Sequence, residues 1–291
     1  MTAKEFYNIL SKKIKNRRDI VIEKYKLRYK NGVYEFLKVV SKGIKPKDKI
    51  IIIRAGIHGE EIAGPLTILN HVNKIIDYAH ERNIKIIIYP LGNPSGFEIG
   101  ARYSIDNVLS KSSDVNNDFL RYELEDGKRM DDIQDSNAFK SWYWSSDKKL
   151  GLKLTLENGL MHRLLKKDFL AQVVAVLDLH QDYITENVGP AAYHYSYGDL
   201  SAYKKIIEKI KKIAPILKNK YIGAGEESPM KSDENGFIVR HDGTLTDLFY
   251  RLGAKYSVTV ETTGATPINE ACKVNLIWIF GLIDLITRRQ Q

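Results

Sequence analysis

The stretch Lys49-Ile50-Ile51-Ile52-Ile53 decides the fold class. A short, continuously apolar run of this kind is typical of a strand that is buried on both faces. Residues 60–80 repeat apolar side chains at helical spacing directly after it. Buried strands that alternate with amphipathic helices predict an α/β fold, with a mainly parallel sheet and helices on both faces. Further strands are expected at 84–89, 173–179 and 256–260, and further helices at 204–217 and 271–288.

The flanking segments are expected to belong to the same domain, which spans residues 1–291. Residues 1–45 are predicted to form an N-terminal helix and a hairpin, because strand-like runs at 24–30 and 33–40 flank the turn dipeptide Asn31-Gly32. Residues 92–150 contain few periodic apolar runs and many polar residues. A stretch of that length without clear elements predicts a functional loop region.

The composition excludes several classes of protein. The single cysteine, Cys272, rules out an intrachain disulfide and a cysteine-type zinc finger. The 45 Lys and Arg residues exceed the 36 Asp and Glu residues, which gives a net charge of +9. Basic segments such as Lys12-Lys13-Ile14-Lys15 and Lys204-Lys205 have the pattern of solvated helix faces. No nucleic-acid partner is therefore expected, and the charge indicates solubility with a mild preference for anionic substrates.

The location in the cell is expected to be the cytoplasm. Residues 1–19 are polar and lysine-rich and contain no apolar core of a secretory signal. The longest apolar run, residues 276–286, is much shorter than the roughly 20 residues that a membrane span needs, and Asp284 interrupts it. No membrane association is predicted.

The first candidate for chemistry is the pair His58 and Glu61, which follows the strand at 49–53 and opens the predicted helix. Their spacing of three lets one helical turn aim both side chains at one point. Imidazole nitrogen and carboxylate oxygen are both zinc ligands. The alternative is a polar loop histidine beside an acidic residue that merely favours a helix N-terminus.

His180 is the second candidate, because it ends the buried strand at 173–179, where an open α/β sheet places its ligands. An ordinary histidine at a strand end is the alternative. Two closely spaced ligands and a distant third, here His58, Glu61 and His180, are typical of a catalytic zinc site that keeps a fourth position open for water. The sequence therefore predicts one Zn²⁺ per chain.

Glu261 is the third candidate, at the end of the buried strand at 256–260. A carboxylate there is costly unless it is paired or lies in a cleft. Beside zinc it would act as the general base and then the general acid. The alternative role is to cap the turn that follows.

A series of motifs resembles the zinc carboxypeptidases of the M14 type. The resemblance is strongest to their compact bacterial branch, near succinylglutamate desuccinylase and aspartoacylase, and it covers residues 45–290. It implies a mixed, mostly parallel twisted sheet of about eight strands and one catalytic zinc ion. The motifs, in chain order, are His58-x-x-Glu61, Asn93-Pro94-Ser95-Gly96, Arg102, Asp114-Val115-Asn116, His180 and Glu261.

The resemblance also implies roles for individual residues. Glu261 matches the catalytic glutamate of the family, and Arg102 matches the arginine that polarises the scissile carbonyl and steadies the oxyanion. Asp114 matches the acid that hydrogen-bonds the first zinc histidine. Asn116 matches the asparagine that helps to hold the terminal carboxylate of the substrate.

The sequence departs from the peptidases where they present an arginine to that carboxylate. Asn117 occupies the position, so the charge-assisted fork is missing. Arg240, which precedes Glu261 by 21 residues, is a candidate to supply the positive charge from another loop. A surface arginine without such a role is the alternative.

The resulting hypothesis is a zinc-dependent hydrolase that cleaves an amide bond near a carboxylate in a small peptide, in the manner of a carboxypeptidase. One alternative is an N-acyl amino acid deacylase of the succinylglutamate desuccinylase or aspartoacylase type, acting on an acylated amino acid. A catalytically inactive zinc-binding interaction module is a third possibility. Glu261 and Arg102 argue against it, because metal binding alone requires neither.

Overall fold

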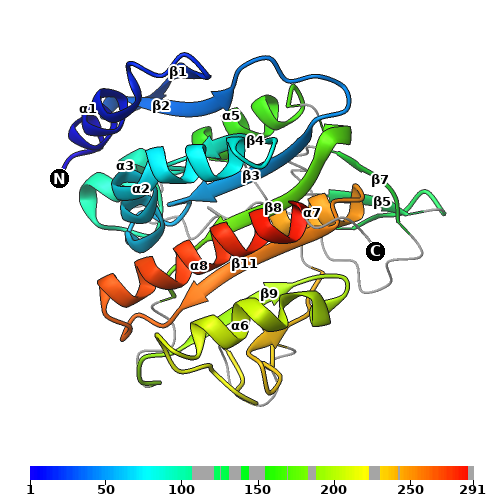
Figure 1. Cartoon of the computed structure of the whole chain (residues 1–291). Helices are drawn as coiled ribbons and strands as arrows, with labels where there is room; N and C mark the ends of the chain where they lie inside the picture. The colour runs from blue at the N-terminus through cyan, green and yellow to red at the C-terminus, as the bar shows by residue number, and fades with distance from the viewer. Residues whose placement is uncertain are drawn as a thin grey trace.

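An eight-stranded sheet forms the centre of the computed structural model (Figure 1). The structure describes residues 1–106, 121–124, 126–130, 139–143, 155–168, 170–182, 188–222, 230–241 and 243–287. In chain order the strands of the large sheet are β1 (Ile20–Tyr29), β2 (Gly32–Ser41), β3 (Lys49–Ala55), β4 (Ile84–Tyr89), β8 (Val173–Leu179), β9 (Ala192–Ser196), β10 (Phe237–Ile238) and β11 (Tyr256–Thr262).

The spatial order of the strands is β1-β2-β4-β3-β8-β11-β9-β10. The four central strands β4, β3, β8 and β11 run parallel to one another. The hairpin of β1 and β2 and the strand β9 add antiparallel pairs on the two sides, and β10 pairs parallel with β9. The predicted mixed sheet with a parallel centre and helices on both faces is thus confirmed.

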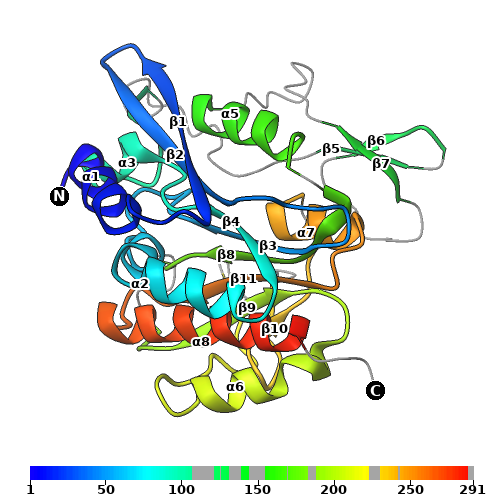
Figure 2. The same cartoon turned by 45° about the horizontal axis from the view of Figure 1, so that its top comes forward.

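The helices cover both faces of this sheet (Figure 2). In β3, Ile51 and Ile53 point into one apolar layer with α1, α2, α6 and α8, whereas Ile50 and Ile52 point into a second layer with α5 and α7. This alternation follows from the period of two in a strand. The helices are α1 (Ala3–Ile14), α2 (Ala63–His80), α3 (Pro94–Ile99), α5 (Leu156–Leu165), α6 (Lys204–Ile210), α7 (Leu245–Arg251) and α8 (Ile268–Thr287).

The observed elements match most of the predicted ones. The strands at 84–89 and 173–179 have the predicted bounds. The predicted hairpin forms, but its turn is at Lys30 and Asn31, one residue before the expected Asn31-Gly32, because Gly32 pairs with Tyr29. The helix predicted for 204–217 ends at Ile210. Pro215 explains the early end, because a proline inside a helix lacks a backbone donor and clashes with the carbonyl four residues earlier.

The region 92–150, which was expected to be a functional loop region because it lacks clear sequence periods, contains regular elements. The structure shows α3 within it and a small antiparallel sheet with the order β6-β5-β7. These strands are only two to five residues long, so no apolar period reveals them. They are β5 (Arg121–Leu124), β6 (Arg129–Met130) and β7 (Phe139–Tyr143).

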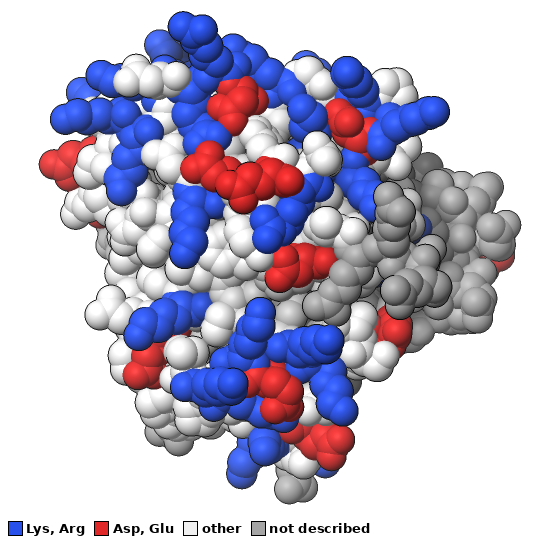
Figure 3. Space-filling view, in the orientation of Figure 1, with Lys and Arg blue, Asp and Glu red and all other residues white. Residues whose placement is uncertain are grey.

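Basic side chains gather in two areas of the face shown in Figure 3, one over α1 and the β1–β2 hairpin and one over α6. Lys12 and Lys13 are exposed on α1, and Lys204 and Lys205 are exposed on α6, as expected for solvated helix faces. None of the described helices is long and apolar enough to cross a membrane.

Candidate metal centre and active site

Three predicted ligands meet at the carboxyl ends of two neighbouring strands. His58 lies in the loop that follows β3, and Glu61 lies two residues before α2 begins. His180 directly follows β8, which pairs parallel with β3. Parallel strands end at the same edge of a sheet, so the residues that follow them come close together there.

The local backbone differs from the prediction that His58 and Glu61 share a helical turn. The helix begins only at Ala63, and residues 58–61 form a turn ahead of it. Gly59 explains the difference, since a Cβ atom there would lie 2.1 Å from the carbonyl carbon of Gly96. This close approach to α3 holds the turn in place and still aims both ligands at one point.

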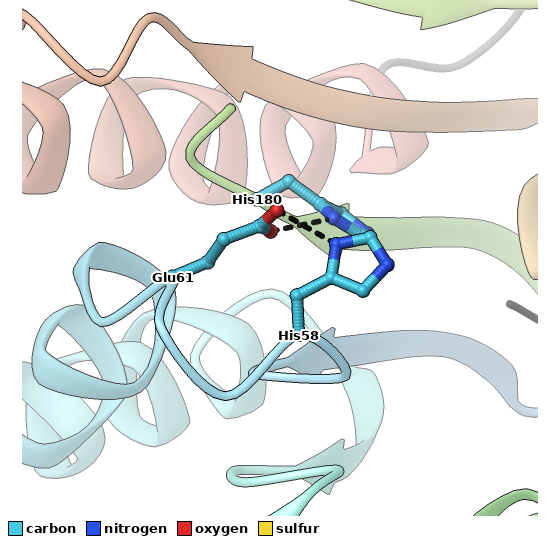
Figure 4. Close-up of side chains that lie close together, drawn as sticks. All are labelled: His58, Glu61 and His180. Carbon is cyan, nitrogen blue, oxygen red and sulfur yellow. Dashed lines mark hydrogen bonds and ion pairs between the residues drawn. The ribbon is translucent and has the colours of Figure 1, made fainter. Parts of the chain in front are cut away.

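The ligand atoms of His58, Glu61 and His180 all lie within 4.8 Å of one another (Figure 4). The two oxygens of Glu61 divide between the histidines: Oε1 lies 2.7 Å from His58 Nδ1, and Oε2 lies 2.8 Å from His180 Nδ1. The histidine rings stand 4.9 Å apart at an angle of 71°. Each ring thus turns Nδ1 toward the carboxylate.

Burial and charge act against each other at this point. Burial lowers the pKa of His58. Burial alone would raise the pKa of Glu61, but the two histidines outweigh it and lower the pKa of this carboxyl. Burial would lower the pKa of His180, but the charges of Asp178, Glu61 and Glu261 raise it well above its usual value. The carboxylates around His180 therefore favour a cation at this position.

Asp178 and Arg54 belong to the centre and were missed by the sequence interpretation. His180 Nε2 lies 2.9 Å from Asp178 Oδ2, and the guanidinium of Arg54 binds both oxygens of Asp178. Two signals were present in the sequence. An arginine interrupts the apolar run of β3, and an aspartate stands two residues before His180 on the same face of β8.

Glu261 lies on β11, the neighbour of β8. Its Oε1 is 3.9 Å from His180 Nδ1, and its Oε2 is buried without a hydrogen-bond partner. Burial raises the pKa of Glu261 well above its usual value; the charge of His180 opposes this rise, and that of Glu61 adds to it. The structure thus brings this predicted catalytic residue to the three ligands with one oxygen available.

Arg102 stands at the mouth of the site. Its Nη1 lies 3.2 Å from Glu61 Oε1, and its side chain is 27% exposed where that of Glu61 is 2% exposed. Its backbone oxygen accepts hydrogen bonds from the Gly59 N–H and from Asn93 Nδ2, both at 3.3 Å. These two hydrogen bonds hold Arg102 to the turn that contains His58 and to Asn93, the N-cap of α3.

The donor set fits a divalent metal ion of the zinc type. Two imidazole nitrogens and one carboxylate are a common set in catalytic zinc sites. His180 Nδ1 and Glu261 Oε2 are buried without a hydrogen bond, although Nδ1 is close to Glu61. Such atoms are costly unless another group binds them. A cation between the ligands would bind His180 Nδ1 and attract Glu261 Oε2.

The structure does not bring Arg240 into contact with these residues. Arg240 follows β10, and Ile238 of β10 is level with Thr259 of β11. Beyond Ile238 the chain runs away from the carboxyl end of β11, where Glu261 lies. Its Nη1 lies 3.0 Å from Met230 Sδ, and its Nε is buried without a hydrogen-bond partner. The other predicted site residues, Asp114, Asn116 and Asn117, lie outside the described residues.

Several solved structures share the fold. A protein from Shewanella baltica OS155, described as a metallopeptidase, has a TM-score of 0.69 at 19% identity over 97% of this chain and 91% of that chain. A similarly described protein from Shewanella amazonensis SB2B has a TM-score of 0.66 at 20% identity over 97% and 92%. A metallo-carboxypeptidase from Burkholderia cenocepacia has a TM-score of 0.58 at 11% identity over 97% and 69%.

A family model gives a more specific result than these distant structures, which show the fold alone. Residues 47–271 match the succinylglutamate desuccinylase/aspartoacylase catalytic domain, and this range contains all three ligands and Glu261. No curated protein sequence matches the chain. Because the family match spans most of its length, the chain belongs to the succinylglutamate desuccinylase/aspartoacylase catalytic domain family.

Proposed function

We propose that the protein is a zinc-dependent hydrolase that cleaves an amide bond near a carboxylate, as a carboxypeptidase does on a small peptide. The observation that carries the proposal is the convergence of His58, Glu61 and His180 within 4.8 Å, with the free oxygen of Glu261 beside them. Such a convergence of ligands and a possible base is the arrangement that metal-assisted hydrolysis requires.

His58, Glu61 and His180 would hold the metal ion. When bound, the ion supplies Lewis acidity, which polarises a carbonyl group and makes water a better nucleophile near neutral pH. The chain itself contributes a rigid set of ligands. Glu61 binds both histidines, and it also accepts the backbone N–H of Gln181 at 3.2 Å, which fixes the carboxylate before any ion arrives.

Glu261 is proposed as the residue that moves the proton. Its available Oε2 takes a proton from the attacking water and later delivers it to the leaving nitrogen. Burial raises the pKa of this carboxyl, and a nearby divalent charge would lower it toward the value of a working base.

Arg102 is proposed to stabilise the negative charge that develops on the carbonyl oxygen. Its guanidinium is partly exposed at the mouth of the site, where a substrate enters, and Glu61 orients it. A planar group with fixed donors suits this task better than a flexible ammonium.

Arg240 is proposed to bind a carboxylate of the substrate. No carboxylate contacts it among the described residues, and its Nε is buried without a partner. The buried donor favours an anionic ligand, since an unpaired group of this kind is costly. The position of Arg240, away from the end of β11, suits a carboxylate at some distance from the scissile bond.

The family match favours a second candidate, the deacylation of an N-acyl amino acid. The two candidates predict different substrates for the same centre. A panel of dipeptides, N-acyl amino acids and their C-terminal amides, tested with the zinc-loaded protein, distinguishes them. Faster cleavage of dipeptides supports the peptidase, and faster cleavage of acylated amino acids supports the deacylase. No cleavage of either class, with zinc bound, would leave only a binding module.

The same panel tests Arg240. If it binds a substrate carboxylate, the free acid should be preferred over its amide by about 10-fold or more, the scale of a charge-assisted contact. Arg240→Ala should abolish that preference. Lys231→Ala, in the segment that leads to β10, is the control and should keep it. Equal cleavage of acid and amide by the wild type would show that no carboxylate clamp exists.

A further inference from the structure

A row of polar side chains crosses the sheet just below the metal centre. In the register of the strands, Arg54 of β3 is level with Asp178 of β8, and Asp178 is level with Thr259 of β11. Arg54 alternates with Ile53 and Ala55, so it points into the layer of α5 and α7. The row therefore puts a cation and a carboxylate into an otherwise apolar layer.

Arg54 and Asp178 form a buried fork. Arg54 Nε donates to Asp178 Oδ1 at 2.8 Å, and Nη2 donates to Oδ2. Each side chain is only 2% exposed. Burying two charges is expensive, and an apolar pair of the same size is often as stable or more so. The fork differs from the buried pair of Lys38 and Asp168 in that its carboxylate contacts a predicted ligand, His180.

The fork decides which nitrogen of His180 faces the metal centre. Oδ2 of Asp178 lies 2.9 Å from His180 Nε2, so this nitrogen donates its proton away from the centre. The opposite nitrogen, Nδ1, is then the one that faces the metal centre, 2.8 Å from Glu61 Oε2. Because both oxygens of Asp178 are fixed by Arg54, the carboxylate cannot rotate and the ring of His180 keeps this orientation.

The fork also joins the two strands that deliver the ligands. Arg54 precedes His58 by four residues at the end of β3, and Asp178 precedes His180 by two residues on β8. A single pair of side chains thus ties together the bases of both ligand-bearing loops.

We propose that Arg54 is a positioning residue of the metal centre: through Asp178 it fixes His180 and sets the affinity for the metal ion. This inference rests on the proposed function, because it needs the three ligands to bind a metal. It adds a residue that acts on His180 through Asp178. Loss of such outer contacts typically weakens metal binding by about 10- to 100-fold.

The chain offers a matched control in Lys38 of β2. Lys38 is 4% exposed, forms a buried ion pair with Asp168, and precedes Val39, whose partner on β4 is Ile88. Because β2 runs antiparallel to β4, Lys38 is level with Tyr89, which pairs with Arg54 of β3, so Lys38 lies on the same row of the sheet. Three strand spacings separate β2 from β8, about 14 Å, and no ligand contacts Asp168 among the described residues.

The experiment measures zinc affinity by competition with a chromogenic chelator, and metal geometry from the visible absorption of the Co²⁺-loaded protein. Arg54→Met should weaken zinc binding by about 10- to 100-fold and alter the Co²⁺ spectrum. Lys38→Met, which also leaves a buried carboxylate without its cation, should change zinc affinity less than about 2-fold. Urea unfolding of each variant shows whether the two lose comparable stability.

A double-mutant cycle tests the route through Asp178. In the Asp178→Ala background, Arg54→Met should add less than about a 2-fold further loss of zinc affinity, because the proposed route from Arg54 to His180 runs through Asp178. If Arg54→Met does not fold, Arg54→Lys replaces it. Lysine keeps the charge but not the fork, so an affinity between that of the wild type and that of Asp178→Ala is expected.

Two results would overturn the inference while the proposed function stands. One is a folded Arg54 variant that binds zinc as tightly as the wild type. The other is an equal loss of affinity in Lys38→Met, which would make the effect one of general stability. Wild-type protein that binds no zinc would instead refute the proposed function, and the role of Arg54 with it.

Discussion

Replacing Gly59 by alanine tests whether the turn between β3 and α2 must have this backbone for the metal centre to form. An ideal Cβ atom at residue 59 would lie 2.1 Å from Gly96 C, 2.3 Å from Phe97 N and 2.4 Å from Ala101 O. All three atoms belong to backbone, so no side chain can rotate away. The turn or α3 must move by more than an ångström to restore an ordinary contact.

The expected magnitude follows from this overlap. Overpacking by one methyl group typically costs about 1–3 kcal/mol, and unyielding backbone places this site at the upper end. A displacement of about 1 Å of a reacting group costs about 100-fold in rate. Gly59→Ala should therefore lower the free energy of unfolding by about 3 kcal/mol and turnover by about 100-fold, and His58 should bind zinc more weakly.

The assay combines urea unfolding, zinc competition and hydrolysis of the best substrate from the panel. Gly159→Ala is the matched control, because residue 159 lies in α5 and its nearest neighbour would be the flexible end of Arg163 at 3.8 Å. That variant should match the wild type or be slightly more stable. Wild-type stability and turnover in Gly59→Ala would refute the role assigned to this close approach.

Further predictions concern the catalytic groups and one buried histidine. Glu261→Gln should keep zinc and the fold but lose turnover by about 100-fold or more; loss of zinc would make Glu261 a ligand instead. Arg102→Lys should lower kcat with little change in KM, and the reverse pattern in steady-state kinetics would assign Arg102 to ground-state binding. Burial lowers the pKa of His194 from 6.5 to about 3. The neutral His194 therefore makes its full contribution to stability above pH 6.5. As the pH falls from 6.5 toward 3, the free energy of unfolding decreases by about 1.4 kcal/mol per pH unit. Urea titrations from pH 7 to pH 4 should show a smaller loss for His194→Phe, and an unchanged loss would contradict the assignment.

The central strands could be predicted because their apolar runs are local signals. Ile50 to Ile53 are buried on both faces of the sheet, and continuous runs of this kind arise only where helices cover both sides. The three ligands could be predicted for a related reason. His180 directly follows one such strand, His58 lies in the loop that follows its parallel neighbour, and the carboxyl ends of parallel strands meet at one edge.

The partners of the ligands could not be predicted in the same way. Arg54 and Asp178 are far apart in the sequence, and only the register of β3 against β8 shows that they face each other. Register depends on tertiary packing, which a single sequence does not display. The start of α2 at Ala63 was missed because it depends on the approach of Gly59 to α3.

Metal analysis of the purified protein tests the central claim most directly. If His58, Glu61 and His180 form the site, wild-type protein dialysed against buffer with trace zinc should contain about one zinc ion per chain. The double variant His58→Ala/His180→Ala should remain folded and contain almost none, since a lone carboxylate binds zinc weakly. Full zinc occupancy in that variant, or a folded wild type that takes up no zinc, would contradict the claim.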